Sequence, residues 1–367
     1  MNSLGFNKKC KNTKVVVAMS GGVDSSVAAV MLKKEGYDVT GITLNLYSQT
    51  ESKSSKSCCA GRDIADAKKI ANQYDFPHIT LDYQDKFFDG VIDNFVETYA
   101  DGQTPVPCIQ CNQTVKFTDL LGEVKKMNAD TLVTGHYVRR LGNEPNAKLF
   151  KAKDETKDQS YFLFATQKNQ LNYLRFPLGN YFKSEIREMA KNFNLPVSEK
   201  PDSQDICFVT SSSYRDLINK LKPDLNIKGN FLDTEGNILG NHKGIANYTI
   251  GQRKGLGIGG SQYPLYVIDI NKKKNEITLV REFLLKKTII NLEKINWFDE
   301  TIVKDNLKCF AKIRSTQKEN SGTLKIYPNN AEFIFDEEIN NTSPGQACVF
   351  YLKDQVLGGG WISKTNI

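Results

Sequence analysis

A serine- and glycine-rich loop near the N-terminus carries the residues best suited to chemistry. The apolar residues 15–18 lead into Ser20-Gly21-Gly22-Val23-Asp24-Ser25-Ser26, and an Ala- and Val-rich helical pattern follows at once. A loop between a strand and a helix directs backbone N–H groups and the positive end of the helix dipole at an anion. The glycines allow close approach of a ligand, the serines add donors, and Asp24 could hold a metal ion on that anion. The loop is therefore expected to bind phosphate.

Neither of the two commonest phosphate-binding patterns describes this loop. It lacks the Gly-x-x-x-x-Gly-Lys-Ser/Thr order, and it does not have the Gly-x-Gly-x-x-Gly spacing. It resembles instead the PP-loop of ATP pyrophosphatases, which cut ATP between the α- and β-phosphates and adenylate a substrate. The alternative is an ordinary strand-to-helix turn whose glycines serve geometry alone.

Cysteines form the second set of reactive candidates. Cys108 and Cys111 make a Cys-x-x-Cys motif just before a helical pattern, where a helix dipole favours the thiolate. Cys207 lies in a polar loop and could exchange sulfur with this pair if the fold brings them together. The spacing leaves open a redox pair, half of a zinc site, an iron–sulfur cluster with Cys207, or plain packing. A second Cys-x-x-Cys is absent from the sequence, which argues against a four-thiolate zinc site.

Composition indicates an ordinary globular chain. The 367 residues are 40% hydrophobic and 25% charged, and the net charge of +7 permits a polyanionic partner without demanding one. No apolar run reaches the length of a membrane span, and the N-terminal residues lack a signal-peptide core. We therefore expect a cytoplasmic protein without a membrane partner, whose eight cysteines are thiols.

Strand-like and helix-like patterns alternate in the first half of the chain. This alternation predicts an α/β fold with a doubly wound parallel sheet of the PP-loop ATP pyrophosphatase type, with the ligand at the carboxyl ends of the strands. Expected strands are 15–18, 39–46, 78–81 and 131–134, and expected helices are 25–35, 63–74, 116–127 and 183–194. Frequent glycines and then short strands follow. The predicted domains are a catalytic domain over 1–208, a small β-rich central domain over 209–282 and a C-terminal β-barrel over 283–367.

Several motifs, taken together, resemble the tRNA-specific 2-thiouridylase (MnmA/TrmU) family. They occur in the family's order and extend from residue 14 to residue 362. Besides the loop at 20–26, they are Cys58-Cys59, 104–112, Thr134-Gly135-His136-Tyr137, 157–161, 203–208, 251–256, Pro344-Gly345-Gln346 and Gly358-Gly359-Gly360.

The resemblance implies an activity and a site. The family inserts sulfur at C2 of the wobble uridine in tRNA, using ATP with Mg²⁺ and releasing AMP and pyrophosphate. By position, Cys111 matches the nucleophile and Cys207 the carrier of the persulfide, and the two would close to a disulfide after turnover. Positions matching the ATP site are Ala18, Met19, Ser20, Gly21, Gly22, Val23, Asp24, Ser25, Leu44 and Gly135. Positions matching contacts to the target base are Val106, Pro107 and Cys108, and those matching tRNA contacts are His136, Lys157, Asp158, Gln159, Arg314, Ser315 and Gln346.

The resemblance also implies partners: tRNAs of the Lys, Glu and Gln type, and a cysteine desulfurase or sulfur-relay protein as persulfide donor. The chain departs from the family at Val106, commonly Asn, at Cys108, Asp in some members, and at Ser315, often aromatic. A thiol at 108 leaves open which cysteine attacks and whether a cluster is bound. The turn at 252–255 is a further candidate for phosphate contact. Two alternatives remain: a small-molecule adenylating ligase with a PP-loop, and a redox-sensing or RNA-binding module without catalysis.

Overall fold

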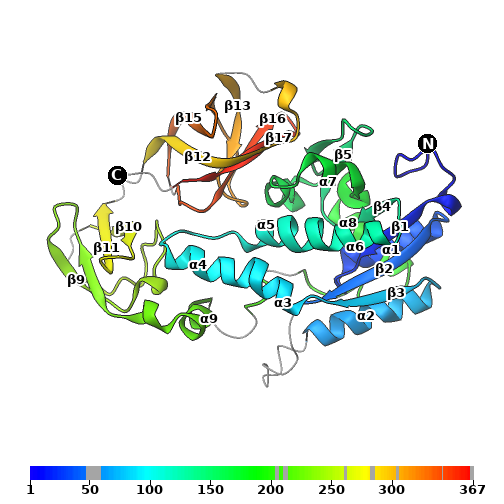
Figure 1. The fold of residues 1–367 in the computed structure, drawn as a ribbon, viewed down its shortest axis with the longest axis horizontal. Coiled ribbons are helices and arrows are strands. Elements are labelled where there is room, and N and C mark those ends of the chain that lie inside the picture. Colours follow the sequence, from blue (N-terminus) through cyan, green and yellow to red (C-terminus); the bar gives the residue numbers. More distant parts are fainter. Residues whose placement is uncertain are drawn as a thin grey trace.

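Three sheets, each with its own core, make up the protein (Figure 1). The computed structural model describes residues 1–46, 59–202, 206–209, 214–259, 263–281, 286–302, 306–340 and 342–363. The motif residues Cys58 and 203–205 lie outside these ranges. Within the described residues, no helix combines the length and the apolarity that a bilayer span requires.

The first sheet is parallel, and its strand order is β3-β2-β1-β4-β7. Its strands are β1 (Lys14–Ala18), β2 (Asp38–Asn45), β3 (His78–Asp82), β4 (Thr131–Val133) and β7 (Leu174–Arg175). The helices of this part are α1 (Val23–Lys34), α2 (Cys59–Gln73), α3 (Gln84–Phe87), α4 (Asn94–Ala100), α5 (Pro107–Cys111), α6 (Leu121–Lys126), α7 (Lys168–Tyr173) and α8 (Lys183–Asn192). The predicted doubly wound parallel sheet is confirmed.

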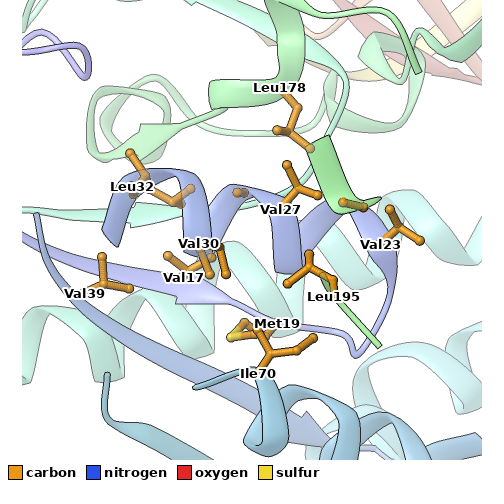
Figure 2. Close-up of a cluster of buried hydrophobic side chains, with 14 of the residues drawn as sticks. Val17, Met19, Val23, Val27, Val30, Leu32, Val39, Ile70, Leu178 and Leu195 are labelled. Atoms are coloured by element: carbon orange, nitrogen blue, oxygen red, sulfur yellow. The ribbon is translucent and has the colours of Figure 1, made fainter. Parts of the chain in front are cut away.

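Helix α1 is buried on almost every side, which explains its apolar, small-residue sequence. Val17 and Val39 of the sheet, Val27 and Val30 of α1, and Leu195 after α8 meet in one core (Figure 2). Val27 and Val30 are fully buried. Because a close-packed core resists small displacements, the loop that precedes α1 is held in a fixed position.

One predicted helix is longer than its pattern indicated. The segment expected over 116–127 begins at Pro107 and continues through α5, the π-helical turn η4 (Asn112–Leu120) and α6. Proline is well suited to the first helical position because its fixed φ matches the helix and its missing N–H needs no partner there. The Cys-x-x-Cys motif therefore lies within the first two turns of this helix.

The second sheet is small and has the order β10-β11-β8-β9. It consists of β8 (Gly229–Leu232), β9 (Ile238–His242), β10 (Leu265–Asn271) and β11 (Glu276–Arg281), with helix α9 (Tyr214–Leu221) beside it. Strands β10 and β11 form an antiparallel hairpin whose turn is the segment Asn-Lys-Lys-Lys-Asn at 271–275.

The third sheet closes into a six-stranded barrel, as predicted. Its strands are β12 (Lys287–Trp297), β13 (Leu307–Lys312), β14 (Asn320–Ile326), β15 (Asn330–Ile339), β16 (Ala347–Leu352) and β17 (Gln355–Ile362), and pairing of β12 with β17 closes it. A hairpin from the first part of the chain, β5 (Val138–Leu141) and β6 (Lys148–Lys151), extends this sheet through pairing of β6 with β17. The barrel is thus joined to the parallel-sheet part by backbone hydrogen bonds, which no local pattern had indicated.

A candidate nucleotide and thiol site

The phosphate-loop candidate lies at the carboxyl end of β1. Ser25 Oγ accepts a hydrogen bond from the Ser20 backbone N–H at 3.1 Å, and Ser26 Oγ donates to the Gly22 carbonyl oxygen at 2.7 Å. Gly22 precedes the first turn of α1 and has no side chain to cap it. The first N–H groups of α1 are therefore left for a ligand, as at other anion-binding helix ends.

Glycine is required at two positions around this loop. Gly21 has a φ of +69°, and a Cβ there would lie 2.3 Å from the Asp63 carbonyl oxygen of α2. A Cβ on Gly135, just beyond β4, would lie 2.9 Å from the Ser25 backbone nitrogen. Strands β2 and β4 flank β1, so Leu44, near the end of β2, lies on the other side of β1 from Gly135. The predicted nucleotide-site residues thus gather along one edge of the sheet.

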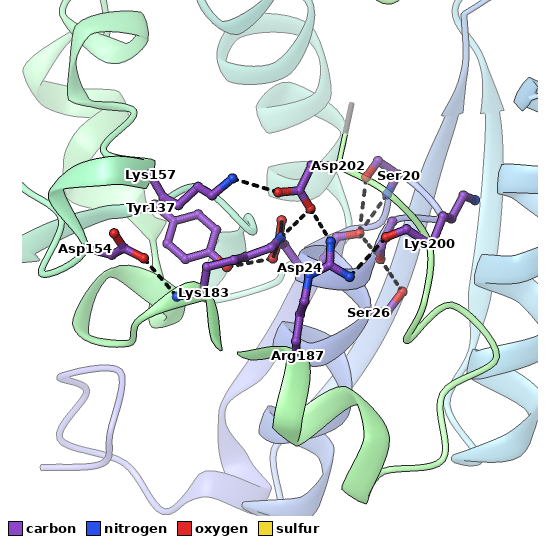
Figure 3. A network of polar contacts seen from close by, with 12 residues as sticks. Ser20, Asp24, Ser26, Tyr137, Asp154, Lys157, Lys183, Arg187, Lys200 and Asp202 are labelled. Atoms are coloured by element: carbon purple, nitrogen blue, oxygen red, sulfur yellow. Dashed lines mark hydrogen bonds and ion pairs between the residues drawn. The ribbon is translucent and has the colours of Figure 1, made fainter. Parts of the chain in front are cut away.

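Asp24 is engaged by protein groups rather than offered to a metal ion. Lys183 Nζ donates to both of its carboxylate oxygens at 2.7 Å, and the Tyr137 hydroxyl donates to it at 2.7 Å (Figure 3). Burial and the neighbouring Asp24 carboxylate both raise the pKa of Tyr137, so that its hydroxyl stays protonated as a donor. Lys183 and Tyr137 therefore hold the Asp24 carboxylate in this structure, and its role toward a metal ion stays a prediction.

Asp202 forms ion pairs with three cationic side chains beside the loop. Lys157 and Lys183 approach it at 2.9 Å and Arg187 at 2.8 Å. Burial alone would raise the pKa of Asp202, but the hydrogen bonds from Lys157 and Lys183 outweigh it and lower the pKa to about 2. Lys183 joins this group to Asp24, so a continuous polar network runs from the loop to Asp202 (Figure 3).

Sequence reasoning missed Lys183, Arg187 and Lys200, which all belong to this network. The predicted helix over 183–194 placed Lys183 and Arg187 four residues apart on one face. Only the fold shows that this face meets the phosphate-loop candidate. The burial of Lys183, 10% exposed, is typical of a lysine whose charge is paired.

The thiols of the predicted sulfur site come from segments far apart in sequence. Cys111 packs in an apolar cluster with Phe87 and Val115, and both Leu44 and Phe208 pack against this same cluster. Phe208 also makes edge-on ring contacts with Phe87 and Phe95. Because Phe208 is the neighbour of Cys207, these contacts anchor the turn that carries Cys207 close to Cys111 and to the nucleotide side of the sheet.

Cys108 and Cys111 differ in exposure. Cys108 is exposed, whereas Cys111 is only 8% exposed. Burial is the main cause that raises the pKa of Cys111, to about 11; the Lys116 charge opposes it, and Cys207 and Cys108 add to it. Cys108 reaches the surface, but the protein atoms packed around its sulfur exclude enough water to raise its pKa as well, and the Lys116 charge again opposes the shift. In this state Cys111 is a protonated thiol at neutral pH, although it lies in the second turn of a helix.

A metal or cluster does not fit these thiols as they stand. Within the described ranges, no group of three or more His, Cys, Asp or Glu side chains is arranged to hold a metal ion. Cys108, Cys111 and Cys207 all fall inside those ranges, so their sulfur atoms do not form such a group in this conformation.

The residues expected to contact tRNA near the loop have internal partners. Asp158 accepts from Ser160 Oγ at 2.6 Å, and Gln159 Oε1 accepts from the Tyr137 backbone N–H at 2.8 Å. The His136 ring shares a hydrogen bond of 2.8 Å with Thr134 and lies edge-on to two phenylalanine rings. Burial, and then the Lys116 charge, lower the pKa of His136 well below its ordinary value. His136 is therefore neutral at physiological pH.

The remaining expected tRNA contacts line one pocket. Arg314, Ser315 and Gln346 of the barrel part share it with Thr104, from the segment before the Cys-x-x-Cys motif, and with polar side chains of the central sheet's part. The Gln346 amide donates to the Thr104 carbonyl oxygen at 3.2 Å. Arg215, Gln252 and Lys254 also line this pocket. All three parts of the chain therefore contribute to it, and its charged side chains are positive.

Comparison with known proteins agrees with this architecture. Three family models match: a "tRNA methyl transferase HUP domain" over residues 13–211, a "tRNA methyl transferase PRC-barrel domain" over 215–281 and an "Aminomethyltransferase beta-barrel domain" over 287–362. Among solved structures, a 4-thiouridine synthetase–RNA complex with bound ATP covers 58% of this chain and 51% of its own at 16% identity and a TM-score of 0.34, too small a likeness to carry function.

Curated relatives match over nearly the whole chain. The tRNA-specific 2-thiouridylase MnmA of Ehrlichia canis (strain Jake) is 49% identical over 97% of this chain and 96% of its own length. That of Wolbachia sp. subsp. Brugia malayi (strain TRS) is 51% identical over 95% of both. That of Paracoccus denitrificans (strain Pd 1222) is 47% identical over 99% of this chain and 95% of its own. With such identity from end to end, this chain belongs to the tRNA-specific 2-thiouridylase family.

Proposed function

We propose that this protein replaces the C2 oxygen of the wobble uridine in tRNA with sulfur, with the loop at 18–25 holding ATP and with Cys111 and Cys207 moving the sulfur. The observation that carries the proposal is the apolar cluster shared by Cys111, Phe208 and Leu44. It brings the segment of Cys207 to Cys111 and sets both beside the edge of the sheet where the phosphate loop begins. Family membership supports the same activity.

ATP would activate a poor leaving group. The uridine C2 oxygen attacks the α-phosphorus and pyrophosphate departs, so that the oxygen later leaves as part of AMP. The backbone N–H groups at the start of α1 would receive the phosphate oxygens, and the cations Lys157, Lys183 and Arg187, which pair with Asp24 and Asp202 here, would add positive potential nearby. Asp24, now bound by Lys183 and Tyr137, is the loop residue that could help to hold a Mg²⁺ ion, which would offset the phosphate charge.

The sulfur step uses two thiols. The terminal sulfur of a Cys207 persulfide attacks C2 and AMP departs; the Cys111 thiolate then attacks the Cys207 sulfur, which breaks the bond to the transferred sulfur and leaves a Cys111–Cys207 disulfide. Alternatively, Cys111 attacks first and releases hydrosulfide, which attacks C2. Both orders use the Cys111 thiolate, so the raised pKa of Cys111 slows its attack on the Cys207 sulfur in either order and does not choose between them. A thiol reductant must restore the pair in either case.

The pocket between the three parts supports a role in binding tRNA. Arg215, Lys254 and Arg314 give it positive charge that suits RNA phosphates. The roles of His136, Lys157, Asp158 and Gln159 toward tRNA, and of 106–108 toward the base, stay predictions. So do tRNAs of the Lys, Glu and Gln type, a cysteine desulfurase or relay protein as donor, and a cytoplasmic location.

Mass analysis of tRNA nucleosides after reaction with ATP and a persulfide donor tests the proposal. Cys111→Ala and Cys207→Ala should each lose 2-thiouridine, whereas Cys108→Ala should keep partial activity. Cys10→Ala is the matched control, because Cys10 lies in the N-terminal segment and packs against a different core cluster. Full activity of Cys207→Ala would refute the persulfide assignment. Adenylation of a small molecule that proceeds without tRNA or either thiol would favour the ligase alternative.

A further inference from the structure

Lys200 lies between the phosphate loop and helix α2. Its Nζ donates to the Gly21 carbonyl oxygen at 2.9 Å, to Asp63 at 2.6 Å and to Asp66 at 2.9 Å. An ammonium group has three N–H donors, and these three acceptors use all of them. Lys200 therefore holds protein groups together in this structure and has no donor left for a phosphate.

The contact that Lys200 secures is unusually close. The Asp63 backbone packs against the loop, and only a glycine at position 21 leaves room for the Asp63 carbonyl oxygen; the Asp63 carboxylate is linked to the loop through Lys200. The side chains of Lys200, Asp63 and Asp66 are each about a third exposed, at 30%, 31% and 32%. Partial shielding of this kind makes an ion pair stronger than a fully exposed one.

Charge gives Lys200 a second effect on the loop. Without its ammonium group, two carboxylates would stand unneutralised next to the segment that must receive a triphosphate. Burial alone would lower the pKa of Lys200, but the hydrogen bonds that it donates to Asp63 and Asp66 raise the pKa above its ordinary value. Lys200 thus remains charged throughout the physiological pH range.

The backbone of Lys200 is itself fixed. Arg187 donates to the carbonyl oxygens of Ser198 and Lys200, each at 3.2 Å, and to the Asp202 carboxylate at 2.8 Å. Asp202 in turn is bound by Lys183, which holds Asp24. The segment 198–202 is therefore linked to the loop directly at Gly21, through Lys200, and indirectly at Asp24, through Lys183 of α8.

We propose that Lys200 is a positioning residue for nucleotide binding: it fixes the Gly21 backbone against α2 and offsets one of the two negative charges of Asp63 and Asp66 beside the triphosphate. The inference rests on the proposed function, in which this loop holds ATP. It assigns to Lys200 an effect on ATP that acts through the loop rather than through direct contact.

The variant Lys200→Met keeps the aliphatic stem and removes the charge. Its matched control is Lys191→Met, since Lys191 pairs with Glu199 at 3.1 Å on the surface, where the two side chains are 61% and 80% exposed. Calorimetry with ATP, filter binding with tRNA and a thermal melt are measured on each full-length variant. We expect K200M to bind ATP about tenfold more weakly or worse, a change of about 1.4 kcal/mol, with tRNA affinity within a factor of about two. K191M should match the wild type.

The outcomes separate this inference from the proposed function. ATP affinity of K200M equal to that of the wild type would overturn the inference alone, whereas a wild-type chain that binds no ATP would overturn the proposed function. Parallel weakening of ATP and tRNA binding, together with a much lower melting temperature, would mean general structural damage and would also overturn the inference. If K200M does not fold, Asp66→Asn, which removes one acceptor and one of the two carboxylate charges, should leave ATP binding intact or tighter; weaker ATP binding by D66N would contradict the charge argument.

Discussion

The reactivity of Cys111 toward an alkylating reagent should depend on pH in a way that its burial determines. Its thiol is 8% exposed, and burial raises its pKa to about 11. At pH 8 about one Cys111 in a thousand would be a thiolate, compared with about one in four for a cysteine with the ordinary pKa of about 8.5. Iodoacetamide, which reacts with the thiolate, should therefore modify Cys111 on the order of 200-fold more slowly than an ordinary thiol.

The assay compares the same cysteine in two states of the protein. Wild-type protein is alkylated over a series of pH values, digested, and the Cys111 peptide quantified by mass spectrometry; urea-unfolded protein serves as the control. In the folded protein the rate should climb about tenfold per pH unit up to about pH 10, while in the unfolded chain it should level off near pH 9. Poor access alone would lower the rate without moving the pH at which it levels off.

Two results would refute the reasoning. One is a folded-state rate that levels off below pH 9, and the other is a rate at pH 8 close to that of the unfolded chain. The Lys116 charge lowers the pKa of Cys111. In Lys116→Met, the midpoint of the pH dependence of Cys111 alkylation should therefore move to higher pH. Lys126, 75% exposed and paired with Glu123, supplies the control variant Lys126→Met, which should leave the midpoint unchanged.

Two further predictions concern the polar network and the loop. The pKa of Asp202 is about 2 in the folded protein and about 3.9 in the unfolded chain, so its carboxylate should contribute about 2.6 kcal/mol above pH 5, and about half of that should be lost by pH 3. In urea unfolding, the free energy of unfolding of Asp202→Asn should be lower than that of the wild type by about this amount at pH 7 and by less at pH 3. An equal difference at both pH values would contradict the pKa shift. Gly21→Ala places a Cβ 2.3 Å from the Asp63 carbonyl oxygen at a φ of +69°, and should raise the KM for ATP tenfold or more with little change in tRNA affinity. An unchanged KM in pyrophosphate-release kinetics would show that the loop does not need this contact.

Local pattern was sufficient for much of the fold. The alternation of strands and helices predicted the parallel sheet, because in a βα unit each strand is followed directly along the chain by its helix. The loop at 20–26 was recognised for the same reason, since its donors come from neighbouring residues. The barrel strands followed from their short, regular spacing. The hairpin β5–β6 was not anticipated, because its pairing with β17 joins residues about two hundred positions apart.

The sequence by itself determined which residues could do chemistry: two glycines, a run of serines, a Cys-x-x-Cys pair and a distant cysteine. Only the tertiary structure decided what surrounds them. The Asp24 carboxylate is bound by Lys183, which the sequence did not indicate, and the Cys111 thiol, expected to be favoured as a thiolate by a helix dipole, has a pKa that burial raises. Burial and long-range ion pairs depend on segments that meet in space but are separated along the chain, so spacing in sequence does not reveal them.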